Sequence, residues 1–368
     1  MEEPDDLIKI KAPGKLYIAG EYAVVDGMPA ILVALNQYIT AQIKLAKRSG
    51  TIVSKQYPNH VVHWRRRNRQ IVFDHPKKPL CYILSAIKIT EAYAKSLQIK
   101  PRLYDLKINS QLDSPDGKKY GLGSSAAVTV ATVHALCNLY RIPVSKLQLF
   151  KLAAIAHFSV QGNGSLGDIA TSVYGGWIAF RTFNHHWLTK MKTKLSINDL
   201  INQPWPHLKI KSLHAPKRLK LLIGWTGTPA STSQLVRQVE KGRQNHQSIY
   251  HSFLLSSKYC VLSMIKGFKT NSLALIKRQI MVNRDLLNHL GNLTNVKIET
   301  PKLKQLCQIV TECGGVAKSS GAGGGDCGIA IIDRTKPFQL ILGRWRQNQI
   351  LPLEFKVSNS PSREVKDD

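Results

Sequence analysis

The chain has 368 residues, of which 43% are apolar, and a formal net charge of +29 at pH 7. This size and composition are typical of a globular protein with two domains, and no apolar run approaches the ~20 residues of a membrane span. The acidic start, Met1 to Asp6, lacks the apolar core of a signal peptide, so we expect a cytoplasmic protein with no membrane partner.

The N-terminal part of the chain predicts strands and helices in alternation. Residues 8–12 alternate between apolar and polar side chains, which predicts a strand that ends at Pro13-Gly14. The same reasoning predicts further strands over residues 30–35, 39–45 and 103–108, and a helix over residues 82–97.

A basic run, His63 to Arg69, stands among short apolar stretches. It could bind RNA, or it could be the solvated tip of a β-hairpin. No RNA-recognition signature or zinc-finger spacing accompanies the charge, and the six cysteines are scattered like reduced structural thiols. The hairpin is therefore favoured, and we expect no nucleic-acid partner.

A glycine-rich turn at Lys119–Ala127 leads into an apolar helix with a predicted stripe of Val128, Ala131, Ala135, Leu136 and Leu139. Its two glycines allow the backbone to approach a ligand closely. The two serines after them, Ser124 and Ser125, are natural N-caps. Because the first N–H groups of a helix are unpaired and the helix dipole is positive there, this arrangement favours phosphate binding.

Two common phosphate loops fit this turn poorly. The Gly-Lys-Ser/Thr ending of a Walker A loop is absent. A Rossmann fingerprint needs a preceding strand and an acidic residue about twenty positions later, but a polar loop precedes the turn, and Arg141 and Lys146 follow it. A capped core helix without any ligand is the simplest alternative.

A second motif surrounds Lys15, which follows Pro13-Gly14 and precedes Gly20-Glu21-Tyr22. A lone lysine after a strand is usually a surface charge. Here the flanking turns favour a fixed position, and an ammonium group on a flexible stem can bridge a substrate oxygen and a phosphate.

The next helices are predicted over residues 145–160 and from Ser165 onward. Ser165 and Asp168 have the spacing of a capping box, which would make them purely structural. Residues 184–215 show little periodicity and are predicted to be the connection between two domains.

The C-terminal part predicts a strand, several helices and another strand before a polar tail. The predicted elements are a strand over residues 219–225, helices over 231–290 with breaks at Gly242 and residues 269–271, a helix over 301–313, a strand over 328–332 and a disordered tail over 358–368.

A second glycine-rich segment, Lys318–Asp326, lies between the last predicted helix and strand. It has four glycines in five positions, Gly321 and Gly323 to Gly325. A flexible tip would explain this composition, but the high entropic cost of ordering glycine favours a segment that lines a ligand.

The motif around Lys15, the glycine-rich turn and the second glycine-rich segment follow one another along the chain in this order. Together they resemble the motifs of the GHMP small-molecule kinase family. The resemblance implies an α+β fold of two domains, with a ribosomal-protein-S5-like ATP-binding domain over residues 1–190 and a ferredoxin-like domain over 215–357. The active site would lie in the cleft between them. ATP would bind as its Mg²⁺ complex, with Ser125 near the metal.

The family motifs also imply roles for individual residues of this sequence. Lys15 and Asp168 would be catalytic, with Asp168 accepting the proton of the substrate or orienting the nucleophile. The implied ATP-binding residues are Lys119, Gly121, Leu122, Gly123, Ser124, Ser125 and Ala126. The implied substrate-binding residues are Lys118, Tyr22, Ser165, Ser233, Ser319, Ser320, Gly321 and Gly323.

Within the family, details around the glycine-rich turn are similar to the phosphomevalonate kinases. Lys118 and Lys119 suit a substrate that already carries phosphate, and His157 stands where mevalonate kinases have a magnesium-binding glutamate. A neutral imidazole is a poor magnesium ligand. The implied reaction is ATP-dependent conversion of 5-phosphomevalonate to 5-diphosphomevalonate on the route to isoprenoids. A mevalonate kinase is the alternative, and a basic RNA-binding protein is a remote one.

Overall fold

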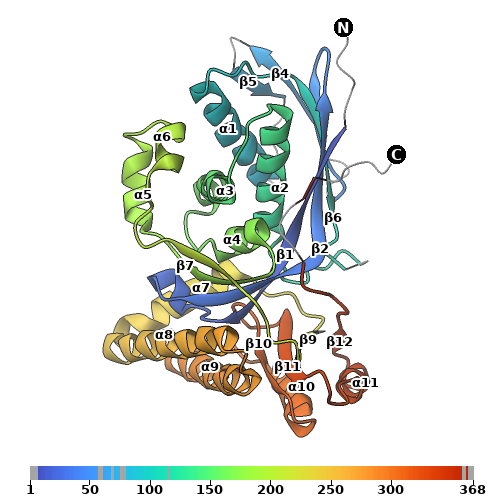
Figure 1. Cartoon of the computed structure of the whole chain (residues 1–368), viewed down its shortest axis with the longest axis vertical. Helices are drawn as coiled ribbons and strands as arrows, with labels where there is room; N and C mark the ends of the chain where they lie inside the picture. The colour runs from blue at the N-terminus through green and yellow to red at the C-terminus, as the bar shows by residue number, and fades with distance from the viewer. Residues whose placement is uncertain are drawn as a thin grey trace.

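The computed structural model describes residues 7–56, 61–67, 70–74, 80–114, 116–358 and 362–363. Figure 1 shows two bodies stacked along the long axis. The upper body is a large sheet with helices on one face, and the lower body is a smaller sheet with its own helices. The two-domain α+β fold that the resemblance implies is confirmed.

The large sheet is built around two long antiparallel strands, β1 (Ile8–Ala19) and β2 (Ala30–Leu45). Its strand order is β13-β1-β2-β6-β3-β4-β5, and β7 extends it by pairing with β2 and β8. The remaining strands are β3 (Gly50–Ser54), β4 (Val62–Arg67), β5 (Gln70–Phe73), β6 (Tyr104–Ser110), β7 (Trp177–Arg181), β8 (Lys209–Leu213) and β13 (Ser362–Arg363).

The predicted end of the first strand at Pro13-Gly14 is wrong. β1 continues through these residues, and the register shifts there, because Pro13 is opposite Tyr38 while Gly14 is opposite Leu35. The two strands expected over residues 30–35 and 39–45 are therefore one strand with a bulge. A Cβ at Gly14 would come within 2.7 Å of Leu112, so the glycine allows the following loops to pack closely on β1.

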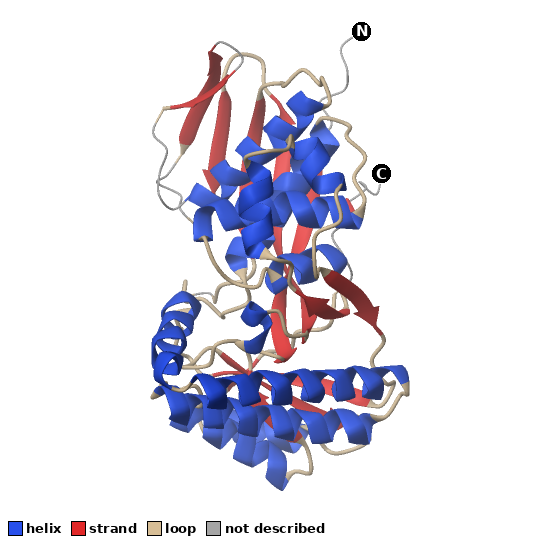
Figure 2. Cartoon of the chain, turned by 90° about the vertical axis from the view of Figure 1, so that its left-hand side faces the viewer, coloured by secondary structure: helices blue, strands red, loops and turns tan. Residues whose placement is uncertain are grey.

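Four helices cover one face of this sheet (Figure 2): α1 (Cys81–Ser96), α2 (Ser124–Leu139), α3 (Lys146–Gln161) and α4 (Gly167–Tyr174). The single apolar stripe predicted for α2 is too narrow. Thr129, Thr132 and Val133 are buried as well, because α2 packs against β1 and β2 on one side and against three helices on the others. The helix that begins at the glycine-rich turn is thus fixed on nearly all sides.

Residues 184–215 are not the irregular connection that the sequence predicts. They form α5 (His185–Lys192), α6 (Ile197–Asn202) and β8, and β8 pairs with β7 of the large sheet. The side chains of Asn184 and Ser196 accept the N-cap hydrogen bonds of the two helices. Local capping thus organises a segment whose apolar pattern is weak.

The lower body has the sheet order β10-β11-β9-β12, packed against helices. Its first four helices match the predicted ones, including the breaks after Gly242 and Lys269, but the last helix, Gln339–Gln347, was not predicted. The bounds are β9 (Leu219–Trp225), α7 (Thr232–Gly242), α8 (Gln247–Lys269), α9 (Leu273–Thr294), α10 (Pro301–Glu312), β10 (Val316–Ser319), β11 (Cys327–Asp333), α11 (Gln339–Gln347) and β12 (Leu351–Pro352).

The end of the chain returns to the upper body. Val357 forms a bridge with Leu35, and β13 pairs with β1 opposite Ile10 and Lys11. The expectation of a disordered tail is therefore wrong for Ser358 and for β13, and the rest of residues 358–368 lies outside the described residues. A sequence without apolar periodicity can still add a strand, because the partner strand supplies the hydrogen bonds.

In the described part of the chain, no helix has the length and apolar character to span a membrane. All six cysteines are free, as predicted, and four of them are buried.

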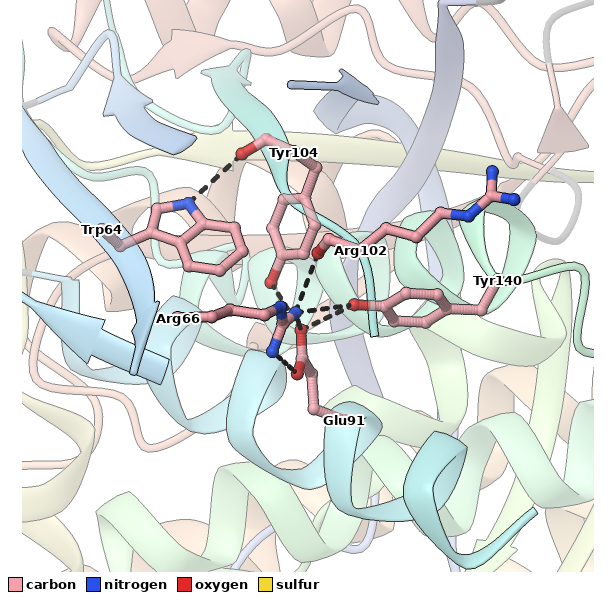
Figure 3. A network of polar contacts seen from close by, with 6 residues as sticks. All are labelled: Trp64, Arg66, Glu91, Arg102, Tyr104 and Tyr140. Atoms are coloured by element: carbon pink, nitrogen blue, oxygen red, sulfur yellow. Dashed lines mark hydrogen bonds and ion pairs between the residues drawn. The ribbon is translucent and has the colours of Figure 1, made fainter. Parts of the chain in front are cut away.

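The predicted hairpin tip is only partly solvated. Strands β4 and β5 do pair, and Arg65 and Arg67 are exposed, but Arg66 points inward. Its guanidinium donates to both carboxylate oxygens of Glu91 on α1, at 2.8 and 2.5 Å (Figure 3). The hydroxyl of Tyr140 donates to the same carboxylate at 2.6 Å. Arg66 thus joins the outer strands to the helical layer, while Asn68 and Arg69 lie outside the described residues.

Replacing Arg66 by Ser should lower the free energy of unfolding by about 2–3 kcal/mol, because the buried Glu91 carboxylate would lose its charged partner. The double change Arg65→Ser and Arg67→Ser removes two exposed charges and serves as the control, with little expected effect. Urea unfolding followed by circular dichroism measures both. Equal stability of the two variants would contradict the structural role of Arg66.

Candidate active site

A cavity of about 530 Å³ lies where the two bodies meet. The upper body contributes residues of β1, the glycine-rich turn before α2, and the starts of α2 and α4. The lower body contributes five residues between Pro229 and Arg237, and Gly321, Ala322 and Asp326 of the second glycine-rich segment. All three predicted motifs therefore reach one cavity.

The glycine-rich turn is held against β1 by its backbone. Lys15 N donates to Leu122 O at 2.8 Å, and both Gly121 and Gly123 have positive φ, 79° and 81°. The expected serine caps of α2 are wrong: the helix begins at Ser124, and its N-cap is Gly123, without a side-chain cap bond. The first N–H groups of α2 are thus left without the side-chain cap that the serines were expected to supply.

The two predicted catalytic side chains lie beside this turn. A Cβ at Gly123 would be 3.1 Å from Cε of Lys15 and 3.7 Å from Cβ of Asp168. The ammonium of Lys15 donates to Gly121 O at 3.1 Å. Lys15 therefore runs along the turn, with its charge near the start of α2 and with Asp168 close by.

The start of α4 is not the capping box that its sequence spacing suggests. Its N-cap is Leu166, with φ 63° and no side-chain cap bond. Oδ1 of Asp168 accepts from the adjacent Ile169 N at 2.9 Å, while the Ser165 hydroxyl shares a hydrogen bond of 2.9 Å with the Tyr17 hydroxyl. Burial, together with the nearby Asp168 charge, raises the pKa of Tyr17 well above its usual value. Tyr17 is therefore a neutral hydrogen-bonding group in the cavity wall.

His157 is buried next to the start of α2. Its Nε2 is 3.1 Å from the Ser125 hydroxyl, and its ring stacks on Tyr82 at 4.8 Å between centroids. Burial lowers the pKa of His157, although Asp168 acts in the opposite direction. The imidazole is therefore neutral at pH 7, and it orients Ser125 rather than adding a positive charge to the cavity.

A buried ion pair joins the two bodies beside the cavity. Lys318 of β10 donates to Glu21 at 2.5 Å, and their side chains are 0% and 2% exposed. Close to this pair, the Tyr22 hydroxyl donates to Ala322 O at 2.6 Å, and the Ser320 hydroxyl donates to Tyr17 O at 2.9 Å. The strand that carries Lys15 is thus fastened to the second glycine-rich segment.

The structure brings most of the predicted site residues to the cavity wall. Those that line it are Lys15, Tyr22, Lys119, Gly121, Leu122, Gly123, Ser124, Ser125, Ser165, Asp168 and Gly321.

Five predicted site residues do not line the cavity: Lys118, Ala126, Ser319, Ser320 and Gly323. Lys118 is exposed and pairs with Asp116 at 3.0 Å. Ser233 lies in α7, but its side chain is outside the described part of the structure. The roles assigned to these residues stay predictions.

Sequence reasoning did not assign roles to several residues of the cavity wall. Three of them lie inside the motifs described above: Tyr17, Glu21 and Asp326. The sequence shows that these residues belong to the motifs, but it does not show that their side chains face the cavity. Arg237 of α7 has no sequence signal, because only the fold brings that helix to the cleft.

The chain matches two family models, the GHMP kinases N terminal domain over residues 82–176 and the GHMP kinases C terminal domain over residues 264–350. These two matches lie in the upper and lower bodies respectively.

Individual relatives extend over nearly the whole chain. A phosphomevalonate kinase of Streptomyces sp. (strain CL190) is 35% identical, covering 93% of this chain and 95% of the relative. A mevalonate kinase of Pyrococcus horikoshii is 29% identical, covering 87% of each. The structure of Streptococcus pneumoniae phosphomevalonate kinase in complex with phosphomevalonate and AMPPNP is similar with a TM-score of 0.82 and 28% identity, covering 97% of this chain and 99% of the other.

Replacing Glu21 by Gln should destabilise the protein by about 3–5 kcal/mol, because the buried Lys318 ammonium would lose its counter-charge. The double variant Glu21→Gln with Lys318→Met should recover part of that loss. Glu354→Gln breaks an exposed pair with Arg346 and should cost at most about 1 kcal/mol. Thermal unfolding compares the three, and a Glu21→Gln variant as stable as the control would refute the argument.

Proposed function

The chain belongs to the GHMP kinase family, and from this premise we propose that it transfers the γ-phosphoryl group of ATP to 5-phosphomevalonate. The products would be ADP and 5-diphosphomevalonate. The observation that carries the proposal is the likeness to phosphomevalonate kinases over nearly the whole chain, with the three predicted motifs gathered at one cavity. The cations Lys15, Lys119 and Arg237 in its wall suit two substrates that both carry phosphate.

In the proposed reaction, an oxygen of the substrate phosphate attacks the γ-phosphorus while the bond to the bridging oxygen of ADP breaks. The turn at Gly121–Gly123 and the start of α2 would hold the phosphates of ATP through backbone N–H groups. Lys15, whose ammonium lies at Gly121 O, would stabilise the negative charge that moves between the two reacting oxygens.

Asp168 would act mainly by orientation. The second pKa of a phosphate monoester is about 6, so the attacking oxygen is already largely deprotonated at pH 7. A base that removes a proton is then needed less than a fixed charge that keeps Lys15 in place. The position of Asp168 beside the same glycine as the Lys15 stem supports this role.

The cavity fits a magnesium ion that ATP itself brings. The described residues include no cluster of three His, Cys, Asp or Glu side chains arranged to hold a metal. Magnesium prefers oxygen ligands and is commonly held by substrate phosphates, water and one or two protein groups. The Ser125 hydroxyl would be one of these protein groups, and the bound ion would neutralise charge on the phosphates.

The choice of substrate is tested by comparing ADP release with 5-phosphomevalonate and with mevalonate. We expect kcat/KM to be at least ~100-fold higher for 5-phosphomevalonate, because cations meant for a phosphate would be left unpaired by mevalonate. A coupled assay with purified protein measures both, with homoserine and galactose as further controls. Equal or reversed preference would favour the mevalonate kinase alternative.

The two catalytic roles are tested by Lys15→Met and Asp168→Asn. Each should lower kcat by roughly 100-fold or more, as happens when a charge acting in the transition state is lost. ATP affinity, measured by calorimetry, should change little. Lys44→Met removes an exposed lysine from β2 and serves as the control. An Asp168→Asn variant with normal turnover and lower thermal stability would show that Asp168 is only structural.

A further inference from the structure

Asp326 places a carboxylate of the lower body directly against the phosphate loop of the upper body. Its Oδ1 accepts a hydrogen bond from Ala230 N at 2.9 Å. Its Oδ2 would be 2.5 Å from a Cβ at Gly121, so the carboxylate occupies the space that a side chain there would need. Glycine at position 121 therefore serves two purposes. It allows the positive φ of the turn, and it leaves room for the Asp326 carboxylate.

The backbone around Asp326 fixes the direction of this carboxylate. Asp326 has φ 50°, a left-handed conformation that Asp and Asn tolerate better than most residues. Its N–H donates to Thr228 O at 2.8 Å, and its carbonyl accepts from the Thr226 N–H at 2.9 Å and from the Thr226 hydroxyl at 3.0 Å. A residue bonded on every side in this way has little freedom to turn its side chain elsewhere.

The neighbouring contacts keep the two bodies together at this point. Sγ of Cys327 lies 3.2 Å from Tyr120 O, and the ring of Tyr120 meets the edge of Trp225 at 5.1 Å between centroids. Tyr120 and Gly121, the start of the phosphate loop, are thus both in contact with the lower body. Asp326 is the charged group within this contact.

Lys15 is the cation whose positive charge acts on the Asp326 carboxylate. Its ammonium donates to Gly121 O, the carbonyl of the same glycine on which Asp326 packs. Asp168 lies beside Gly123, so a carboxylate stands at each end of the stretch that the Lys15 side chain follows. Burial raises the pKa of Asp326, while the positive charge of Lys15 acts to lower it.

We propose that Asp326 is a positioning residue that holds the Lys15 ammonium at Gly121 and so ties the geometry of the reacting centre to the seating of the lower body. This inference rests on the proposed function, because Lys15 acts on the transferred phosphoryl group there. The competing explanation is that Asp326 only caps the turn at residues 228–230.

Asp326→Asn separates the two explanations. Asparagine keeps an oxygen acceptor for Ala230 N and tolerates the left-handed conformation, but it removes the charge. We expect kcat to fall by roughly 10- to 100-fold, the usual effect of a misplaced catalytic group, with KM for ATP and the ADP-induced shift in Tm nearly unchanged. Asp326→Ala removes the cap as well, so it should lower both kcat and Tm.

Asp333→Asn is the matched control, because it removes one carboxylate from the other end of β11, where Asp333 pairs with the exposed Arg218. It should leave kcat unchanged. The proposal is overturned if Asp326→Asn keeps kcat within about twofold of the wild type, or if its Tm falls as far as that of Asp326→Ala. These outcomes are distinct from failure of the proposed function, which would appear as wild-type protein that releases no ADP with 5-phosphomevalonate.

Discussion

The buried contact between Glu21 and Lys318 is the interaction on which the site depends. Two opposite charges without solvent are stable only when they stay together, so the end of β1 and the second glycine-rich segment hold a fixed distance. The strand that carries Lys15 is thereby set relative to the lower body. Movement of one body along the other would separate these buried charges, and a buried charge without its partner is unfavourable.

The glycine-rich turn before α2 is accordingly supported by both bodies. Its helix is embedded in the upper body, where β1, β2 and three other helices surround α2. Its first residues, Tyr120 and Gly121, are in contact with Cys327 and Asp326 of the lower body. A loop supported from both sides loses little freedom when a ligand binds, and such preorganisation favours positioning over induced rearrangement.

Local patterns were sufficient to predict most helices and the inner strands, because glycine turns and apolar periodicity act over short distances. The proximity of Lys15, Gly123 and Asp168 was implied by the resemblance to the GHMP kinases and not by local patterns. Local patterns failed where the structure of a segment depends on residues that are distant in the sequence. The inward turn of Arg66 depends on Glu91, the strand β13 depends on the free edge of β1, and the place of Asp326 depends on a glycine about two hundred positions earlier. Capping also overrode the weak pattern of residues 184–215.

The pairing of β13 with β1 has a consequence for the order in which the molecule is made. β1 is synthesised long before β13, because the two strands are far apart in the sequence. The edge of β1 at Ile10 and Lys11 therefore lacks this partner strand until β13 is made, and an open edge is a template for association with other chains. A nascent chain shortened by premature termination would lack β13 at these two residues, although its glycine-rich turn and its cleft were already encoded.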